Sequence, residues 1–260
     1  MSLLKRYSQM ITRILSLWIL LAWCVAPALA DEARVAVAAN FSSPAEMLVE
    51  QFELLQPHEI ELVFGSSARF YAQVQNGAPF DAFLSADLEK PQLLAEEGLA
   101  AADSLRAYAI GRLVLWTAEP SLEIGSESLT ANAGGKIALA NPRLAPYGLA
   151  AREAIDNLGL DDQLADSLIM GENISQAYQF VATGNAPLGF VALSQVGRNG
   201  VIEQGSGWLV PAELHSPIRQ YAVLLTEENA AASAFLEFLR GPEARRIIYS
   251  FGYTMDAAEP

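Results

Sequence analysis

The sequence predicts an α/β protein with largely parallel sheets, and three observations support this fold class. From residue 34 onward, short apolar runs alternate with stretches whose apolar residues recur at helical spacing. Several of the apolar runs are unbroken, as in strands that helices cover on both faces. Sequence repeats, low-complexity tracts and a Ser/Gly-rich linker are absent. Such an alternation is typical of domains in which helices cover a mostly parallel sheet.

Seven short apolar segments are predicted to be strands: 34–39, 59–64, 81–86, 113–117, 136–140, 187–193 and 220–226. Longer segments between them carry apolar residues three or four positions apart, which predicts helices over 45–55, 150–158, 174–181 and 235–239. If the chain forms two domains, we expect it to cross between them through strand-like segments near 108–113 and 215–221.

The first thirty residues have the pattern of a secretory signal peptide. Lys5, Arg6 and Arg13 come before the apolar stretch ILSLWILLAWCVA. The segment PALA follows this stretch and ends with a small residue, Ala30. A basic start, an apolar middle and small residues at the −3 and −1 positions predict cleavage before Asp31. We therefore expect the mature chain to act outside the cytoplasm.

Two alternatives for this leader remain open. A retained membrane anchor is disfavoured because the apolar middle is short for a membrane span. A lipid attached to Cys24 is disfavoured by the bulky Trp23 before it. Cleavage would remove the chain's one cysteine, so the mature protein would form no disulfide.

Cleavage also makes an acidic chain more acidic. The leader holds three positive charges and no negative one, so its removal takes the formal net charge from −14 to −17. Such a chain repels nucleic acid and anionic membrane surfaces over long range. Any anion that it binds must therefore be held by local groups.

Four predicted strand-to-helix junctions contain the candidate binding residues. At the first, Ser43 and Glu46 are spaced as a capping box with Pro44 between them, so Ser43 is predicted to cap the helix. Asn40 lies three residues earlier and has no such duty. It ends the first predicted strand, where ligand-facing loops begin.

At the second junction, one of Ser66 and Ser67 is enough to cap the helix, and the other is surplus. The remaining two junctions start helices near Pro146 or Tyr147, and near Asn173 or Ile174. Each helix start presents unpaired backbone N–H groups and the positive end of a helix dipole. Starts that converge on one point would form an anion site without Lys or Arg. The alternative, that all four are plain caps, stays open.

No residue pattern supports an enzyme. The motifs of zinc hydrolases, redox cysteine pairs and nucleophile-elbow serines are absent. The mature chain keeps only His58 and His215, which lack a partner motif and are predicted to be structural or exposed. Asp81 and Asp87 flank a predicted buried strand. We favour turn caps and sheet ends for these two carboxylates over an acid/base or metal pair.

Five segments carry a family resemblance when they are taken in order: VAVAANFSSPAEML, FGSSARFYAQVQNGAPFDAFLSAD, NPRLAPYGLAAREAI, NAPLGFVALSQV and FLRGPEARRIIYSFGYT. Each segment alone is weak, whereas the ordered set covers essentially the whole mature chain. On these segments the chain resembles the periplasmic molybdate-binding proteins, which capture the substrate of molybdate ABC importers.

The resemblance implies a type II periplasmic binding protein with two lobes, each a mixed, mostly parallel sheet flanked by helices, and a ligand cleft between the lobes. It places residues 31–110 and 217–260 in the first lobe and 111–216 in the second. It also implies a periplasmic protein, cleaved after Ala30, that delivers molybdate or tungstate to a membrane permease. We expect a monomer that needs no cofactor and binds no nucleic acid.

Position by position, the resemblance implies an oxyanion site formed by Asn40, Ser67, Tyr147 and Ile174. Ser67 matches the family's binding serine, whereas Tyr147 and Ile174 match positions that bind through their backbone N–H groups. These residues would contact the oxygens of molybdate, and none would bind its metal atom directly. One departure is Ala192, where many relatives have a donating tyrosine. Either Asn40 or a neighbouring hydroxyl replaces that donor, or the anion specificity differs.

The implied positions are uncharged, so they can only donate hydrogen bonds to a bound anion. Molybdate, tungstate and sulfate retain no proton at neutral pH, unlike phosphate, so cavity size must exclude the smaller sulfate. Two alternatives stay open. A receptor for sulfate, iron or an organic acid is one, although iron would want several Tyr, His or carboxylate ligands and the site offers only Tyr147. A secreted hydrolase is the other, and the scarcity of His disfavours it.

Overall fold

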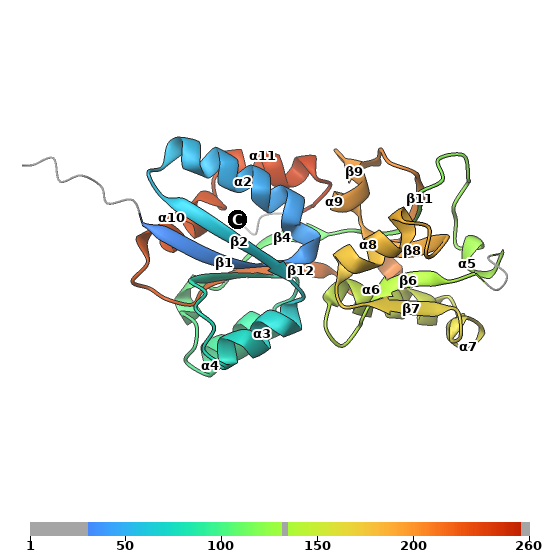
Figure 1. The fold of residues 1–260 in the computed structure, drawn as a ribbon, viewed down its shortest axis with the longest axis horizontal. Coiled ribbons are helices and arrows are strands. Elements are labelled where there is room, and N and C mark those ends of the chain that lie inside the picture. Colours follow the sequence, from blue (N-terminus) through green and yellow to red (C-terminus); the bar gives the residue numbers. More distant parts are fainter. Residues whose placement is uncertain (1–30, 132–134, 256–260) are drawn as a thin grey trace, which may run out of the picture. The chain divides into compact units, whose positions relative to one another are not determined.

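The computed structural model describes residues 31–131 and 135–255, and its strands form two five-stranded sheets and one two-stranded ribbon (Figure 1). In spatial order, the first sheet consists of β2 (Glu59–Gly65), β1 (Glu32–Ala38), β3 (Ala82–Ser85), β12 (Ile218–Leu224) and β4 (Arg106–Gly111). The predicted signal peptide lies outside the described residues.

In spatial order, the second sheet consists of β11 (Ser206–Leu209), β5 (Leu113–Thr117), β8 (Leu188–Ala192), β6 (Ile137–Ala140) and β7 (Leu168–Gly171). The ribbon pairs β9 (Gly197–Arg198) with β10 (Val201–Ile202). We call the first sheet with its helices the first lobe and the second sheet with its helices the second lobe.

Four of the five strands in each sheet run in the same direction. In the first sheet, β12 is antiparallel to both neighbours, while the other strands share one direction. In the second sheet, β5 is the strand that opposes the others. The predicted α/β class with mixed, mostly parallel sheets is confirmed, and each predicted strand corresponds to a strand of the structure.

The helices flank the two sheets (Figure 1). In the first lobe they are η1 (Ala39–Phe41), α2 (Ser42–Leu55), α3 (Ser67–Gln75), α4 (Glu89–Glu96), η2 (Ala102–Ser104), α10 (Ala230–Phe238) and α11 (Pro242–Ser250). In the second lobe they are α5 (Ser128–Ala131), α6 (Pro146–Asn157), α7 (Asp161–Leu164), α8 (Ile174–Ala182), α9 (Leu193–Val196) and η3 (Ala212–Leu214).

The central strand β1 shows why its sequence is apolar without a break. Side chains of a strand alternate between the two faces of a sheet. Val35 and Val37 belong to the core under α2, α10 and α11, whereas Ala36 belongs to a separate core under α3 and α4. All three side chains are fully buried. Helices therefore cover both faces of the first sheet, as the unbroken apolar run predicts.

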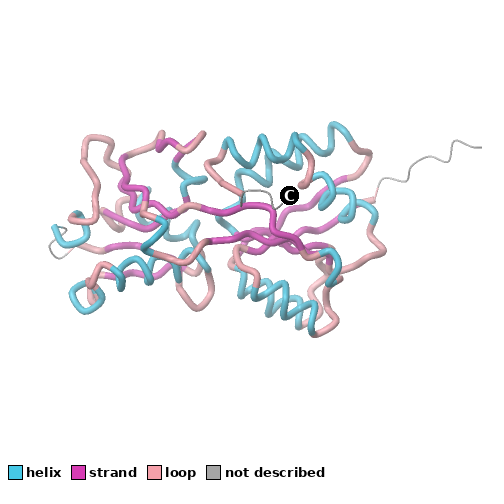
Figure 2. The backbone as a smooth tube through the Cα atoms, turned by 180° about the vertical axis from the view of Figure 1, so that it is seen from behind, coloured by secondary structure: helices cyan, strands magenta, loops and turns pink. Residues whose placement is uncertain are grey.

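The chain passes between the sheets twice. It leaves the first sheet after Gly111, where β4 ends, and enters the second at Leu113, where β5 begins. It leaves the second sheet after Leu209 and returns to the first at Ile218. Because β4 and β12 pair side by side, both passages lie next to each other (Figure 2). We call these two neighbouring passages the hinge.

A buried polar network joins the lobes at the turn after β1. The carbonyl oxygen of Asn40 accepts hydrogen bonds from Ser194 Oγ of α9 at 2.7 Å and from Tyr253 Oη at 2.8 Å. The side-chain amide of Asn40 donates to Gln220 Oε1 at 2.7 Å and to Tyr253 Oη at 2.9 Å. All four residues are buried. The turn that carries Asn40 is thereby attached to both lobes.

We expect Tyr253→Phe to lower the free energy of unfolding by about 1–3 kcal/mol, because it removes one of the two hydrogen-bond partners of the buried Asn40 carbonyl oxygen and one of the two of its side-chain amide. Urea denaturation of the mature protein without ligand measures this change. The control is Tyr249→Phe, since Tyr249 is 47% exposed on the neighbouring helix α11. Equal stability losses in the two variants would contradict the structural role of the Tyr253 hydroxyl.

The same variant has a signature at high pH. Burial raises the pKa of Tyr253 from 10.0 to about 12, although its hydrogen bonds with Ser194 and Asn40 lower it in part. The unfolded chain therefore ionises this phenol at a lower pH than the folded protein. The resulting stabilisation is complete below about pH 10 and is lost as the pH rises towards 12. Stability of Tyr253→Phe should fall less steeply over this range.

Candidate functional site

Residues from all four predicted strand-to-helix junctions line one small pocket between the two lobes. Its cavity volume is about 10 Å³, far below the roughly 300–1,000 Å³ of pockets for drug-sized molecules. Its lining residues are all uncharged: Ala38, Ala39, Asn40, Gly65, Ser66, Ser67, Ala86, Ala145, Pro146, Tyr147, Asn173 and Ile174. The size and the lining together favour a small ion over an organic molecule.

The N-terminal, partially positive ends of several helices lie at the pocket. Helices α3, α6 and α8 begin at Ser67, Pro146 and Ile174, and each of these residues lines the pocket. The first backbone N–H groups of a helix have no acceptor within the helix, and the helix dipole adds partial positive charge there. The pocket can therefore attract an anion although its side chains carry no charge.

The helix starts were partly predicted correctly. Helix α6 begins at Pro146, and α8 begins at Ile174 with the side chain of Asn173 accepting from Gln176 N–H at 3.0 Å. The capping box predicted at Ser43 is wrong. The turn η1 leads directly into α2, so the helix begins at Ser42 with Phe41 before it, and no side chain caps it.

The close approach of α6 to the sheet depends on a glycine. A Cβ atom on Gly148 would lie 2.2 Å from the carbonyl oxygen of Ala140 at the end of β6. Any side chain would therefore push the first turn of α6 away from the strand end. Because Tyr147 precedes this glycine, the close packing also sets where the Tyr147 backbone lies beside the pocket.

The two adjacent serines differ in their surroundings. Ser67 Oγ accepts a hydrogen bond from Ala86 N–H at 3.1 Å, which leaves its own O–H free to donate. Ser66 directly precedes α3, and its side chain makes no capping bond. Its buried hydroxyl has no hydrogen-bond partner among the residues that the structure describes.

Asn40 lines the pocket, yet its side chain is committed elsewhere. Both hydrogen bonds that its amide donates go to Gln220 and Tyr253 at the hinge. Its backbone N–H lies at the start of η1, where a helical turn leaves N–H groups without internal acceptors. The backbone of Asn40 is thus the part that remains suited to a ligand.

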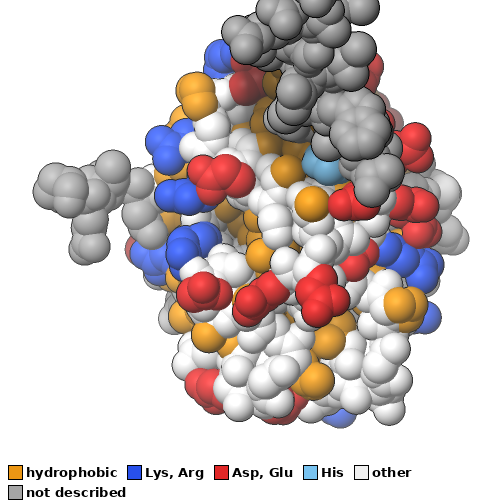
Figure 3. All heavy atoms as spheres, turned by 90° about the vertical axis from the view of Figure 1, so that its left-hand side faces the viewer, with side chains coloured by type: hydrophobic (Ala, Val, Ile, Leu, Met, Phe, Trp, Pro, Cys, Tyr) orange, Lys and Arg blue, Asp and Glu red, His pale blue; other side chains and the backbone are white. Residues whose placement is uncertain are grey.

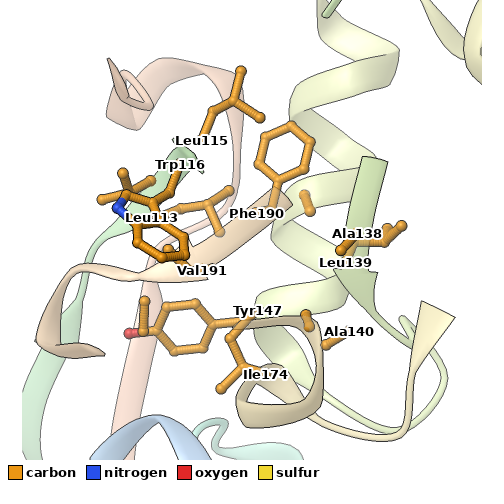
Figure 4. Packing of buried hydrophobic residues seen from close by; sticks show 14 of the residues in the cluster. Leu113, Leu115, Trp116, Ala138, Leu139, Ala140, Tyr147, Ile174, Phe190 and Val191 are labelled. Atoms are coloured by element: carbon orange, nitrogen blue, oxygen red, sulfur yellow. The ribbon is translucent and has the colours of Figure 1, made fainter. Parts of the chain in front are cut away.

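Tyr147 and Ile174 lie next to each other at one end of the second-lobe core (Figure 4). The phenol of Tyr147 points towards the hinge. Its hydroxyl oxygen lies so close to Gly111 that a Cβ atom on this glycine would be only 2.0 Å away. Burial raises the pKa of Tyr147 well above its usual value, so the phenol stays protonated. Tyr147 and Ile174 line the pocket at the starts of α6 and α8, where their backbone N–H groups lie.

Ala192 contributes no donor to this pocket. It ends β8, is fully buried and is not one of the lining residues. Its N–H donates to Gln195 Oε1 at 2.9 Å. The departure noted in the sequence thus corresponds to a position without a side-chain hydrogen bond.

Direct contacts between the lobes surround the pocket. Ala68 N–H of α3 donates to the carbonyl oxygen of Leu144 at 3.2 Å. Ser175 Oγ of α8 donates to the carbonyl oxygen of Ala39 at 3.3 Å. At the surface, Arg69 forms an ion pair with Glu172. The two lobes are therefore bonded to each other on the sides of the pocket that α3 and α8 form.

The other sequence candidates have structural roles. His58 Nδ1 accepts from Asp31 N–H at 3.3 Å and its ring stacks on Phe52. Asp81 directly precedes β3 and accepts from Arg34 N–H of β1 at 2.7 Å. Asp87 accepts at 2.9 Å from the N–H of Lys90, which lies in the first turn of α4.

His215 Nδ1 lies 2.8 Å from the carbonyl oxygen of its neighbour Ser216. In the ranges 31–131 and 135–255, no three His, Cys, Asp or Glu side chains gather where they could hold a metal ion. Within the same ranges, no helix is long and apolar enough to span a bilayer.

Three residues of the network around Asn40 escaped the sequence reasoning: Ser194, Gln220 and Tyr253. Tyr253 and Asn40 are 213 positions apart, so no local pattern could connect them. The nearest signal was the segment SFGYT, which carries the family resemblance but has no spacing rule that assigns a hydrogen bond.

Comparison with known proteins agrees with this geometry. Residues 33–254 match the model of the family described as bacterial extracellular solute-binding protein. The chain is 48% identical to the molybdate-binding protein ModA of Azotobacter vinelandii, over 86% of this chain and 90% of that protein. It is 46% identical to ModA of Rhodobacter capsulatus, over 88% of this chain and 91% of that protein.

A solved structure extends the comparison to three dimensions. The periplasmic molybdate-binding protein of Azotobacter vinelandii superimposes with a TM-score of 0.81 at 39% identity, covering 86% of this chain and 99% of that one. The match includes both sheets and the helices around them. The chain therefore belongs to the bacterial extracellular solute-binding proteins and, within them, to the molybdate-binding proteins.

Proposed function

We propose that this protein captures molybdate, and also tungstate, outside the cytoplasm and delivers it to the membrane permease of an ABC importer. The observation that carries the proposal is the small, uncharged pocket on which several helix starts converge. The identity of 48% to a molybdate-binding relative supports the same ligand. The protein binds and releases its ligand unchanged, without a cofactor.

In this proposal the oxyanion is bound by Asn40, Ser67, Tyr147 and Ile174. Ser67 donates through its hydroxyl, whose oxygen already accepts from Ala86 N–H. Tyr147 and Ile174 donate through backbone N–H groups at the starts of α6 and α8. Asn40 donates through its backbone, because its amide serves the hinge. The residues contact the oxygens of the anion and leave its metal atom without protein ligands.

A site of donors selects the protonation state of its ligand. Each group gives a hydrogen bond and none accepts one, so an anion that keeps a proton, such as hydrogen phosphate, leaves that proton unsatisfied. Overall charge cannot supply the attraction, since the chain carries a net −14. On the face shown in Figure 3, basic and acidic side chains are intermixed. The local donors must therefore provide both attraction and selectivity.

We expect titration calorimetry on the mature protein to show tight binding of molybdate and tungstate and weak binding of sulfate and phosphate. Sulfate is smaller, so it cannot reach all donors at full hydrogen-bond strength, and each such bond to a charged group contributes about 1.5–3 kcal/mol. Competition by sulfate at an equal concentration would instead identify a sulfate receptor. The absence of turnover on ester and phosphate substrates would separate either receptor from a hydrolase.

The domain limits and the location belong to the same proposal. Residues 31–110 and 217–260 form the first lobe and 111–216 the second, which is consistent with the passages of the chain after Gly111 and before Ile218. Residues 1–30 are a signal peptide cleaved after Ala30, and the mature protein is a periplasmic monomer. Membership of the bacterial extracellular solute-binding proteins supports export.

Ligand binding closes the two lobes. Asn40 and Ser67 lie in the first lobe, whereas Tyr147 and Ile174 lie in the second, so one anion that contacts all of them favours the closed state. The contacts from Ala68 to Leu144 and from Arg69 to Glu172 connect the lobes beside the pocket. These contacts belong to the closed state and contribute to its stability.

We expect Arg69→Met and Glu172→Gln each to raise the Kd for molybdate by roughly 1.5- to 5-fold, the range of an exposed ion pair of about 0.2–1 kcal/mol. The double variant should match either single one. Asp161→Asn is the control, because its partner Arg152 lies in the same lobe. Additive effects of the two changes, or solution scattering without compaction on adding molybdate, would refute closure through this ion pair.

A further inference from the structure

We propose that the hydroxyl of Ser66 donates a further hydrogen bond to the bound oxyanion and replaces the donor that Ala192 lacks. This inference rests on the proposed function, since it adds a residue to the same anion site. Three observations carry it: the side chain is buried beside the pocket, its hydroxyl has no partner within the described residues, and it does not cap the helix that it precedes.

The backbone explains why Ser66 does not cap α3. A serine before a helix normally accepts a hydrogen bond from the N–H two or three residues later. Two residues later is Ala68, whose N–H donates across the pocket to the carbonyl oxygen of Leu144 in the second lobe. The contact between the lobes therefore takes a capping partner from Ser66. Its hydroxyl remains available although its backbone has the extended conformation of a cap.

Burial makes an idle hydroxyl costly at this position. Ser66 is 2% exposed, so its oxygen cannot regain hydrogen bonds with bulk water. A buried polar group without a partner destabilises the folded state. Helix starts α3, α6 and α8 present further donors to the same pocket. An anion there would accept from Ser66 as well as from Ser67, and the cost of burying the hydroxyl would be recovered on binding.

The structure excludes two side chains that could have replaced the donor absent at Ala192. The amide of Asn40 is held by Gln220 and Tyr253, so it cannot serve the anion without breaking the hinge network. The phenol of Tyr147 points to Gly111. Ser66 is a lining residue whose buried hydroxyl has no partner among the described residues. The geometry thus favours a neighbouring hydroxyl over the side chain of Asn40.

Ser66→Ala tests the inference by two measurements, since the variant should bind molybdate more weakly but should not be less stable without ligand. Titration calorimetry with molybdate should show a Kd about 10- to 150-fold higher than that of the wild type, the effect of one charge-assisted hydrogen bond. The melting temperature without ligand should stay equal or rise, because the variant removes an unpartnered buried hydroxyl. A capping serine would behave in the opposite way, since its loss lowers the stability of the free protein.

Two further variants calibrate the result. Ser67→Ala should weaken binding and also lower the melting temperature, because Ser67 Oγ accepts from Ala86 N–H. Ser233→Ala changes a serine of α10, which does not line the pocket, and should leave the Kd unchanged.

The outcomes separate the two proposals. If the wild type binds molybdate and Ser66→Ala binds within twofold of it, Ser66 is no ligand donor and the inference is wrong, while the proposed function stands. A lower melting temperature with an unchanged Kd would identify Ser66 as a structural residue and would also overturn the inference. If the wild type binds neither molybdate nor tungstate, the proposed function fails and the inference fails with it.

Discussion

The carbonyl oxygen of Asn40 accepts hydrogen bonds from both lobes, and the arrangement of the pocket depends on this acceptor. Ser194 donates from the second lobe and Tyr253 from the C-terminal end of the first. Asn40 lies at the turn between β1 and α2, so these bonds fix that turn relative to the starts of α6 and α8.

Neutral donors offer an acidic protein a way to bind an anion that a basic side chain does not. A buried Lys or Arg would carry a large desolvation cost and would attract sulfate and phosphate equally. Helix starts carry partial charges that are already oriented by the backbone, so binding needs little reorganisation. Selection then rests on the distances between the helix starts, which the packing of Gly148 against Ala140 helps to set.

Local patterns in the sequence were enough to predict the strands and helix starts that surround the pocket. The unbroken run at Val35–Val37 and the proline at Pro146 are such patterns, because burial and capping chemistry act over a few residues. The strands β7, β9, β10 and β11 were missed, since each has four residues or fewer and none is buried along its whole length. The role of Tyr253 depends on a contact between segments 213 positions apart, which spacing cannot express.

The bond from Ala68 N–H to the carbonyl oxygen of Leu144 contains no side-chain atom. Substitution at either residue, proline at 68 excepted, therefore leaves its donor and acceptor in place. The separation of the lobes at this point is encoded by the length of the chain segment that carries Leu144, between β6 and α6. Substitutions in the segment between β6 and α6 would leave the distance between the lobes at the pocket unchanged. An insertion or deletion in this segment would change that distance and therefore which anion fits.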